Sequence, residues 1–164
     1  MDEITLKRIE LLHPAVRQEA RDIYGEICEA LTGSAICRFT HTLRDFAEQA
    51  QLYASGRTIK GPWKTNAKPG QSYHNYGLAI DICLIVDGKQ AIWDMKKDFD
   101  GDKQADWMEC VKVFKKYGWV WGGDWAKSPD GPHFEKTFGL KWQDMKKLYD
   151  SVKFVEKSPY IVLI

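Results

Sequence analysis

The fold is decided by residues 72–81, Ser-Tyr-His-Asn-Tyr-Gly-Leu-Ala-Ile-Asp, which lead from a turn into an apolar run that ends at Val86. The run is short, rich in branched side chains and bounded by glycine-containing turns, a pattern that predicts a buried strand. A carboxylate within such a strand is costly unless a cation or a metal compensates its charge. Asp81 is therefore either one half of a structural ion pair or a metal ligand.

Two histidines favour the metal ligand. His74 lies in the turn before the strand, and His133 lies in residues 130–135, Asp-Gly-Pro-His-Phe-Glu, a second turn that leads into a predicted strand. Two imidazoles and one carboxylate form the donor set of a catalytic zinc site, which leaves a further position for water. Such water ionises near neutral pH and needs a base within reach. Asp130 is the predicted base, and Glu135 is the alternative because it shares a strand face with His133.

Hydrophobic periodicity predicts the remaining elements. We expect helices over residues 4–12, 14–31, 45–54, 104–117 and 140–149, and strands over 34–39, 78–86, 89–94, 119–121, 133–135 and the apolar tail 160–164. The helix 45–54 would turn Phe46, Ala47, Ala50 and Tyr53 inward, and residues 57–71 form a long loop of the kind that often carries function. The predicted class is α+β, with a small antiparallel sheet that carries the zinc site and is flanked by helices.

Length and composition limit the possibilities further. A chain of 164 residues predicts a single domain, with 1–33 as a helical scaffold, 34–140 as the catalytic core and 141–164 as a terminal helix and tail. A net charge of +1 gives no field that would attract nucleic acid, and no stretch approaches the about 20 apolar residues of a membrane helix. We expect a monomer. The first residues lack the basic and apolar regions of a signal peptide, so we expect synthesis in the cytoplasm.

The four cysteines are not spaced as a metal or redox motif. Cys28, Cys37, Cys83 and Cys110 form no CxxC pair. Three of them fall on predicted helix faces or in the central strand, so we expect buried free thiols.

A second cation site is suggested by an acidic segment. Five acids occupy positions 1, 3, 5, 9 and 12 of a calcium-loop template: Asp98, Asp100, Asp102, Asp106 and Glu109. The template has glycine at position 6, where this chain has Lys103. The alternative is an acidic turn at a helix N-terminus, where negative charge is favoured.

The motifs together resemble a known family. The pattern Ser72-x-His74-x-x-Gly77-x-Ala79-x-Asp81, with Asp130-x-x-His133, resembles the zinc peptidases that include D-alanyl-D-alanine carboxypeptidases and dipeptidases. Residues 44–58 and the run Trp-Gly-Gly-Asp-Trp at 121–125 are similar to the L-alanyl-D-glutamate endopeptidases that phages use as endolysins. The resemblance covers about residues 34–140.

The resemblance implies roles for single residues. It implies zinc bound by His74, Asp81 and His133, with Asp130 as general base. Arg44 would stabilise the oxyanion or bind a substrate carboxylate, where the residues alone would suggest a surface ion pair. The predicted substrate contacts are Ser72, Gln49, Trp121 and Trp125, although Ser72 could equally cap its turn and the tryptophans could equally belong to the core.

The implied function is a bacteriolytic peptidase that cuts the L-alanyl-D-glutamate bond in peptidoglycan stem peptides and reaches the cell wall after release. The alternatives are cleavage of D-alanyl-D-alanine by the same chemistry, and a cell-wall-binding module without catalysis. A phage-encoded and a bacterial enzyme both fit the sequence.

Overall fold

The computed structural model of the chain describes residues 1–155 and 158–163. Its helices are α1 (Glu3–Ile9), α2 (Pro14–Ala30), α3 (Phe46–Ala54), α4 (Asp106–Lys116) and α5 (Trp142–Asp150). Its strands are β1 (Ala35–His41), β2 (Ala79–Val86), β3 (Gln90–Ile92), β4 (Val120–Trp121) and β5 (His133–Glu135). Two short 3₁₀ helices, η1 (Tyr73–Tyr76) and η2 (Gly122–Asp124), complete the elements. The predicted α+β class with a small antiparallel sheet is confirmed.

Strand β2 is the centre of the sheet. The strand order is β1-β2-β5-β4, and every pair is antiparallel. One edge of β2 pairs with β1 along its length, whereas the other edge is shared, with β3 opposite Leu84–Val86 and β5 opposite Ala79–Asp81. This register puts Asp81 directly opposite His133. Two residues far apart in the sequence are therefore fixed as neighbours by backbone pairing.

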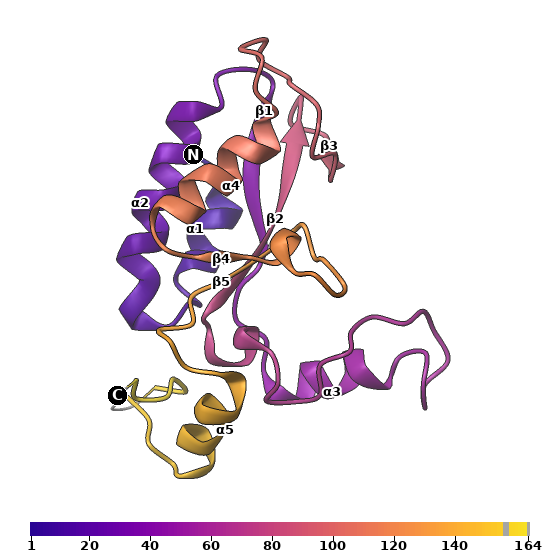
Figure 1. Cartoon of the computed structure of the whole chain (residues 1–164), viewed down its shortest axis with the longest axis vertical. Coiled ribbons are helices and arrows are strands. Elements are labelled where there is room, and N and C mark those ends of the chain that lie inside the picture. Colours follow the sequence, from indigo (N-terminus) through magenta and orange to yellow (C-terminus); the bar gives the residue numbers. More distant parts are fainter. Residues whose placement is uncertain (156–157, 164) are drawn as a thin grey trace.

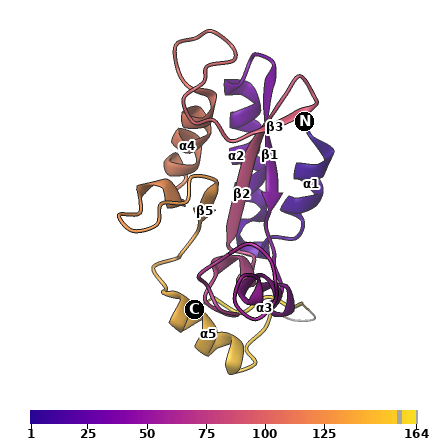
Figure 2. The same cartoon turned by 90° about the vertical axis from the view of Figure 1, so that its right-hand side faces the viewer.

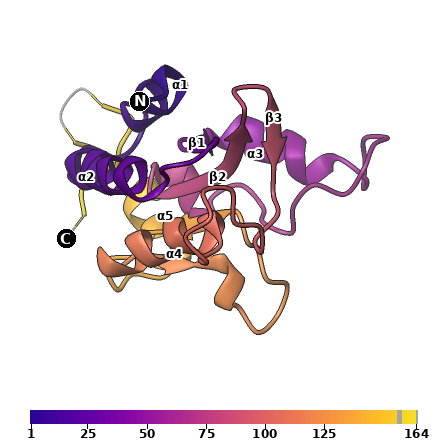
Figure 3. The ribbon, with the colours of Figure 1, turned by 90° about the horizontal axis from the view of Figure 1, so that it is seen from above.

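Helices α1, α2 and α4 cover one side of the sheet, and α3 with the loop after it extends away on the other side (Figures 1 and 3). The core lies between the sheet and the covering helices. Phe114 of α4 stacks on Phe134 of β5 with ring centroids 4.0 Å apart, and Phe39 of β1 lies 5.8 Å from Phe114. These three rings are fully buried. Burial of such large side chains fixes β5, and with it His133, against the helical layer.

The amphipathic patterns of α2 and α4 predicted their buried faces well. The inward stripe of α2 consists of Val16, Ala20, Ile23, Tyr24 and Ile27. The helix begins after His13, which caps it by accepting a hydrogen bond from Ala15 N at 3.2 Å. His13 is only 3% exposed, and its Nε2 lies 2.8 Å from the carbonyl oxygen of Ile161.

Three expectations were wrong. Ala47 and Ala50 of α3 are exposed, and the fully buried residue of that helix is Gln49. The helix extends away from the sheet in Figure 1 and is seen nearly end-on in Figure 2, so much of its surface faces solvent. Cys28 is exposed, since it lies beside the inward stripe of α2 rather than on it, whereas the other three thiols are buried and all four are free. Within the described part of the tail, residues 160–163 form no strand, only a bridge between Phe154 and Ile161. Residue 164 lies outside the described residues.

The turn between η1 and β2 requires glycine. Gly77 adopts φ 68°, and a Cβ added there would lie 2.7 Å from the backbone nitrogen of His13. A side chain would therefore meet both an unfavourable backbone conformation and a steric clash. Gly77 lets the chain reverse directly after His74, so that the histidine returns over the first residues of β2. No helix within the described residues is both long enough and apolar enough to cross a membrane.

Candidate functional site

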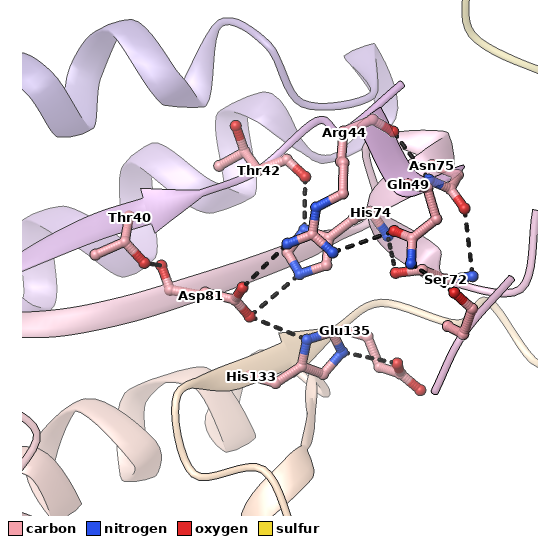
Figure 4. Close-up of polar contacts among 11 residues, drawn as sticks. Thr40, Thr42, Arg44, Gln49, Ser72, His74, Asn75, Asp81, His133 and Glu135 are labelled. Atoms are coloured by element: carbon pink, nitrogen blue, oxygen red, sulfur yellow. Dashed lines mark hydrogen bonds and ion pairs between the residues drawn. The ribbon is translucent and has the colours of Figure 1, made fainter. Parts of the chain in front are cut away.

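Three predicted ligands meet at the end of the sheet where β2 begins. His74 comes from η1, Asp81 from β2 and His133 from β5, and Figure 4 shows their side chains pointing toward one another. One donor atom of each lies within 4.8 Å of a donor atom of the other two. Asp81 Oδ1 is 3.1 Å from His74 Nε2 and 3.1 Å from His133 Nδ1. The structure thus brings together the three side chains that the sequence predicted to converge.

The outer nitrogen of each imidazole is held by a hydrogen-bond acceptor. His74 Nδ1 donates to the carbonyl oxygen of Thr42 at 2.7 Å, and His133 Nε2 donates to Glu135 Oε2 at 2.9 Å. Each bond uses the outer nitrogen, so His74 Nε2 and His133 Nδ1 are the inner nitrogens, and both lie at hydrogen-bond distance from Asp81 Oδ1. Acceptors of this kind behind a histidine fix its tautomer and orientation for metal binding. Glu135 therefore orients His133 from the side away from Asp81.

The electrostatics of the group favour added positive charge. Burial opposes the charged forms, but the two imidazoles hold the pKa of the Asp81 carboxyl well below its usual range. Burial also opposes charge on His133, yet the hydrogen bonds that its ring donates to the carboxylates of Asp81 and Glu135 raise its pKa to about 9. The two histidines are 2% and 6% exposed. A nearly buried pocket that draws a proton onto an imidazole is one in which a bound cation would replace that proton.

Arg44 lies beside Asp81 and is fixed by neighbouring side chains and backbone. Its Nη2 is 3.8 Å from Asp81 Oδ2, and its Nη1 donates to Gln49 Oε1 at 3.2 Å. Asn75 Nδ2 donates to the Arg44 carbonyl oxygen at 3.0 Å. Gln49 in turn donates to the Ala67 carbonyl oxygen at 2.8 Å, so both ends of its amide are used within the protein. Arg44 Nε is buried and has no partner among the described residues.

The predicted base and the ligand His133 share one loop. Gly122 supports this loop closely, because a Cβ added there would lie 2.5 Å from the Asp130 carbonyl oxygen and 3.2 Å from His133 Cβ. Asp130 N also donates to the Gly122 carbonyl oxygen at 2.9 Å. Partial burial of the carboxyl group, followed by the negative charge of Asp81, raises the pKa of Asp130. The run at 121–125 therefore positions Asp130 through the contacts of Gly122.

The three predicted ligands line a cleft of about 840 Å³. Its walls are the end of β1 and α3, the loop 63–73 and the segment 125–135. Among the predicted site residues, the lining includes Arg44, Ser72, His74, Asp81, Trp125, Asp130 and His133. Lys64 and Lys127 add positive charge to the lining. The three convergent side chains therefore lie in the wall of a cleft that a substrate could enter.

The four predicted substrate contacts differ in whether they reach the cleft. Ser72 lines the cleft and also caps η1, since its Oγ accepts from His74 N at 3.3 Å. The Trp125 ring packs 5.3 Å from the His133 ring at the cleft wall. Trp121 lies behind that wall and donates from Nε1 to the Gly131 carbonyl oxygen at 2.7 Å. Gln49 is fully buried beneath Arg44.

Two residues near the site are not among the predicted site residues. Thr42 supplies only a backbone carbonyl to His74, and such a contact leaves no pattern in the side chains. His41 is exposed and lines the cleft at the end of β1, opposite Asp81. The pairing of β1 with β2 places His41 there.

The donor set fits a divalent metal ion. Two imidazole nitrogens and one carboxylate oxygen suit transition metals that accept nitrogen and oxygen ligands, and three protein ligands leave room for water or substrate. Both rings already carry the outer hydrogen bonds that a ligand histidine needs. A small antiparallel sheet that presents such a group in an open cleft is the arrangement of a metal-dependent hydrolase.

Comparison with known proteins identifies the family. A family model described as D-alanyl-D-alanine carboxypeptidase matches residues 65–136. The peptidoglycan L-alanyl-D-glutamate endopeptidase CwlK of Bacillus subtilis is 43% identical over 129 residues, which cover 76% of this chain and 72% of that protein. The chain belongs to the D-alanyl-D-alanine carboxypeptidase family of peptidases.

Two further relatives are more distant. An L-alanyl-D-glutamate peptidase of a Listeria phage is 32% identical over 68 residues, covering 42% of this chain and 22% of that protein. The crystal structure of the L-Ala D-Glu endopeptidase ChiX of Serratia marcescens matches with a TM-score of 0.50 at 20% identity, covering 82% of this chain and 87% of that chain. The second comparison supports the fold alone.

Proposed function

We propose that this chain is a zinc-dependent peptidase that hydrolyses the L-alanyl-D-glutamate bond of peptidoglycan stem peptides. The observation that carries the proposal is the convergence of His74, Asp81 and His133, with donor atoms within 4.8 Å of one another and open to a cleft. The choice of bond is supported by the 43% identity to the endopeptidase of Bacillus subtilis.

The three convergent side chains would hold the ion. His74 Nε2, His133 Nδ1 and one Asp81 oxygen are the free donor atoms, because the outer nitrogens are already bonded. Zinc bound there would supply a Lewis acid and a water molecule of lowered pKa. Thr42 and Glu135 would keep the two rings in their tautomers, and this fixes the geometry before substrate arrives.

Asp130 is the proposed general base. It lines the same cleft as the ligands, and its pKa is raised by partial burial and by Asp81, which makes the carboxylate a better proton acceptor. It would accept a proton from the attacking water and deliver it to the leaving amine. Glu135 is a weaker candidate because His133 Nε2 already occupies its Oε2.

Arg44 is the proposed anion-binding group. Its Nε is buried without a partner among the described residues, and its guanidinium lines the cleft next to Asp81. Such a group would stabilise the developing oxyanion or bind a carboxylate of the stem peptide. We assign Gln49 the task of positioning Arg44, since its amide is fully buried and bonded on both sides. Ser72 and Trp125 are the proposed substrate contacts at the wall.

The lining of the cleft offers cations for the carboxylates of a stem peptide. Arg44, Lys64 and Lys127 line it together with four acids, Glu48, Asp81, Asp130 and Glu135, so a substrate carboxylate would lie near the three cations. Action on the cell wall is supported by the 43% identity to a peptidoglycan endopeptidase, whether the source is a phage or a bacterium.

A second reaction remains a candidate because the matching family model is described as D-alanyl-D-alanine carboxypeptidase. Digestion of purified peptidoglycan followed by mass spectrometry separates the two reactions. Cleavage after L-alanine creates stem fragments with a new glutamate N-terminus, whereas the alternative releases free D-alanine. Release of D-alanine alone would overturn the proposed bond.

The same digest also tests zinc and catalysis. The parent should contain about one zinc per chain, lose activity with a chelator and regain it when zinc returns. A protein that binds wall fragments but never produces new termini, even when loaded with zinc, would instead be a binding module.

A further inference from the structure

A second group of carboxylates lies at the opposite end of β2 from the cleft. Residues 98–105 form a loop before α4, seen at the upper end of Figure 1. Donor atoms within 4.8 Å of one another form two overlapping groups, namely Asp98, Asp100 and Asp106, and Asp100, Asp102 and Glu109. Among the described residues, none of the five acids forms an ion pair with a lysine or arginine. Five negative charges are therefore gathered without a visible counter-charge.

Two of these carboxylates are buried and incompletely bonded. Asp106 is 0% exposed, and its Oδ1 accepts from Phe99 N at 2.8 Å. Glu109 is 8% exposed. Within the part of the chain that the structure describes, Asp106 Oδ2 and Glu109 Oε2 are buried without a hydrogen-bond partner. A buried carboxylate oxygen without a hydrogen bond is strongly unfavourable. Both groups belong to the acidic sets, so they point to a missing positive partner there.

The N-terminus of α4 does not account for these oxygens. Its amides already have acceptors, because Asp106 N donates to the Lys97 carbonyl oxygen and Met108 N and Glu109 N donate to that of Ala105. The cap residue Ala105 has no side chain that could bond the first turn. An acidic turn that merely complements the helix dipole would direct those amides at the carboxylates. The alternative suggested by the sequence is therefore weakened.

We propose that residues 98–109 bind one calcium ion. Calcium takes six to eight oxygen ligands in flexible geometry, and the loop offers five carboxylates in the order of a calcium-loop template. Lys103 stands where the template has glycine, yet it adopts φ 76°, the left-handed conformation that this position requires. Zinc prefers nitrogen and sulfur donors, and magnesium demands a stricter octahedron, so neither suits this group as well.

The bound ion would join three parts of the chain. Asp100 Oδ2 accepts hydrogen bonds from Thr32 N at 3.1 Å and Thr32 Oγ1 at 3.0 Å, which link the loop to the connection between α2 and β1. Asp106 and Glu109 belong to the first turns of α4. The ion would thus clamp the start of α4 to the loop and to the end of α2. This assignment does not rest on the proposed hydrolysis.

Calorimetric titration of zinc-loaded protein with calcium chloride tests the proposal directly. The parent should bind one Ca²⁺ per chain and gain thermal stability as Ca²⁺ is added. Asp102→Asn, at an exposed position, and Glu109→Gln should each weaken Ca²⁺ binding by about tenfold or more, because each removes one ligand charge. Asp22→Asn, which makes the same change at an exposed residue of α2 outside the loop, should bind Ca²⁺ like the parent.

The two loop variants also separate a binding defect from misfolding. Without Ca²⁺, Glu109→Gln should melt at or above the temperature of the parent, because a buried charge is removed. The increase in melting temperature that Ca²⁺ gives the parent should be absent in this variant. The proposal is overturned if up to about 10 mM Ca²⁺, beyond the weakest loops of this type, produces neither binding heat nor a melting shift in the parent. Equal affinity in the parent and both variants would also overturn it.

Discussion

The molecule carries two groups of side chains that could bind a metal ion, and they differ in how they are supported. His74, Asp81 and His133 lie on a 3₁₀ helix and two paired strands, and each imidazole is held by an acceptor behind it. The acidic loop consists of carboxylates on a mainly irregular segment, and two of its oxygens have no hydrogen-bond partner among the described residues. The first group is oriented before an ion arrives, whereas the second is left electrostatically incomplete.

The comparison suggests that the type of donor atom and the rigidity of the backbone that carries it are related. A catalytic ion must keep an open position at a defined place, so its ligands need the fixed register of Asp81 against His133. A stabilising ion can draw flexible carboxylates around itself, so a loop is sufficient. Removing side chains from the first group should therefore affect turnover, and changes in the second should affect stability.

The largest effect is expected from His133→Ala. The substitution removes a donor atom and leaves Asp81 with one imidazole, so zinc should no longer be retained and peptidoglycan hydrolysis should fall to background. Metal analysis and the muropeptide digest measure both. Retention of full activity with metal bound would show that the ion is held elsewhere.

Asp130→Asn should lower kcat by about 10²–10⁴-fold while the zinc content stays near that of the parent. The amide fills the same space but cannot accept the proton of the attacking water. Steady-state kinetics on a soluble stem peptide measure the loss. An unchanged kcat would transfer the role of base to Glu135.

Glu135→Ala should weaken zinc binding by about 10–100-fold, because His133 loses the acceptor that orients it. At saturating zinc, kcat should recover much of its parental value, which distinguishes an orienting residue from a base. Competition with a zinc chelator gives the affinity. A kcat that stays low at saturating zinc would contradict the orienting role.

The smallest effect concerns pH and the acidic loop. Burial, followed by the charges of the four loop aspartates, raises the pKa of Glu109 from 4.5 to about 7. Its folded-state pKa lies above its unfolded value, so its contribution to stability is complete below pH 4.5 and is lost as the pH rises through about 7. The groups around it are Asp98, Asp100, Asp102 and Asp106 of the loop, with Glu26, Glu29, Lys112 and Lys116 from α2 and α4.

Without calcium, the melting temperature of the parent should therefore fall relative to that of Glu109→Gln over this pH interval. Added calcium should reverse the trend, because the ion favours the ionised carboxylate. Thermal melts of both proteins across the interval measure the difference. Parallel curves would show that Glu109 ionises freely in the folded chain.

Much of the architecture could be predicted because its patterns are local. The apolar run of β2 and the apolar stripe of α2 indicate buried faces, and the Asp87-Gly88 turn indicates the pairing of β2 with β3. Each of these patterns involves residues that are close in the sequence. The ligands were predictable for a related reason, since polar side chains placed beside buried strands demand a partner. The class of the sheet and the convergence of the three ligands follow from these signals.

What escaped prediction depends on contacts between distant segments. The Thr42 carbonyl behind His74 has no side-chain signature. Gln49 was predicted as a substrate contact, but its amide is buried and is used by Arg44 and Ala67. The apolar residues of α3 suggested an inward face, but that helix projects from the body and exposes them. A helical pattern shows which residues could be buried, and the rest of the chain decides whether they are.

The shared edge of β2 has an evolutionary consequence. Because the ladder between β2 and β5 sets the Asp81–His133 distance, the outer part of the long loop, residues 57–66, can change in length without displacing either side chain. The segment 122–132 is constrained, because Gly122 packs against the loop that carries Asp130. The sequence of the outer loop is then free to adapt to the wall chemistry of a particular bacterium. Exchange of residues 57–66 between relatives should accordingly give chimaeras with altered host range and an unchanged hydrolytic centre.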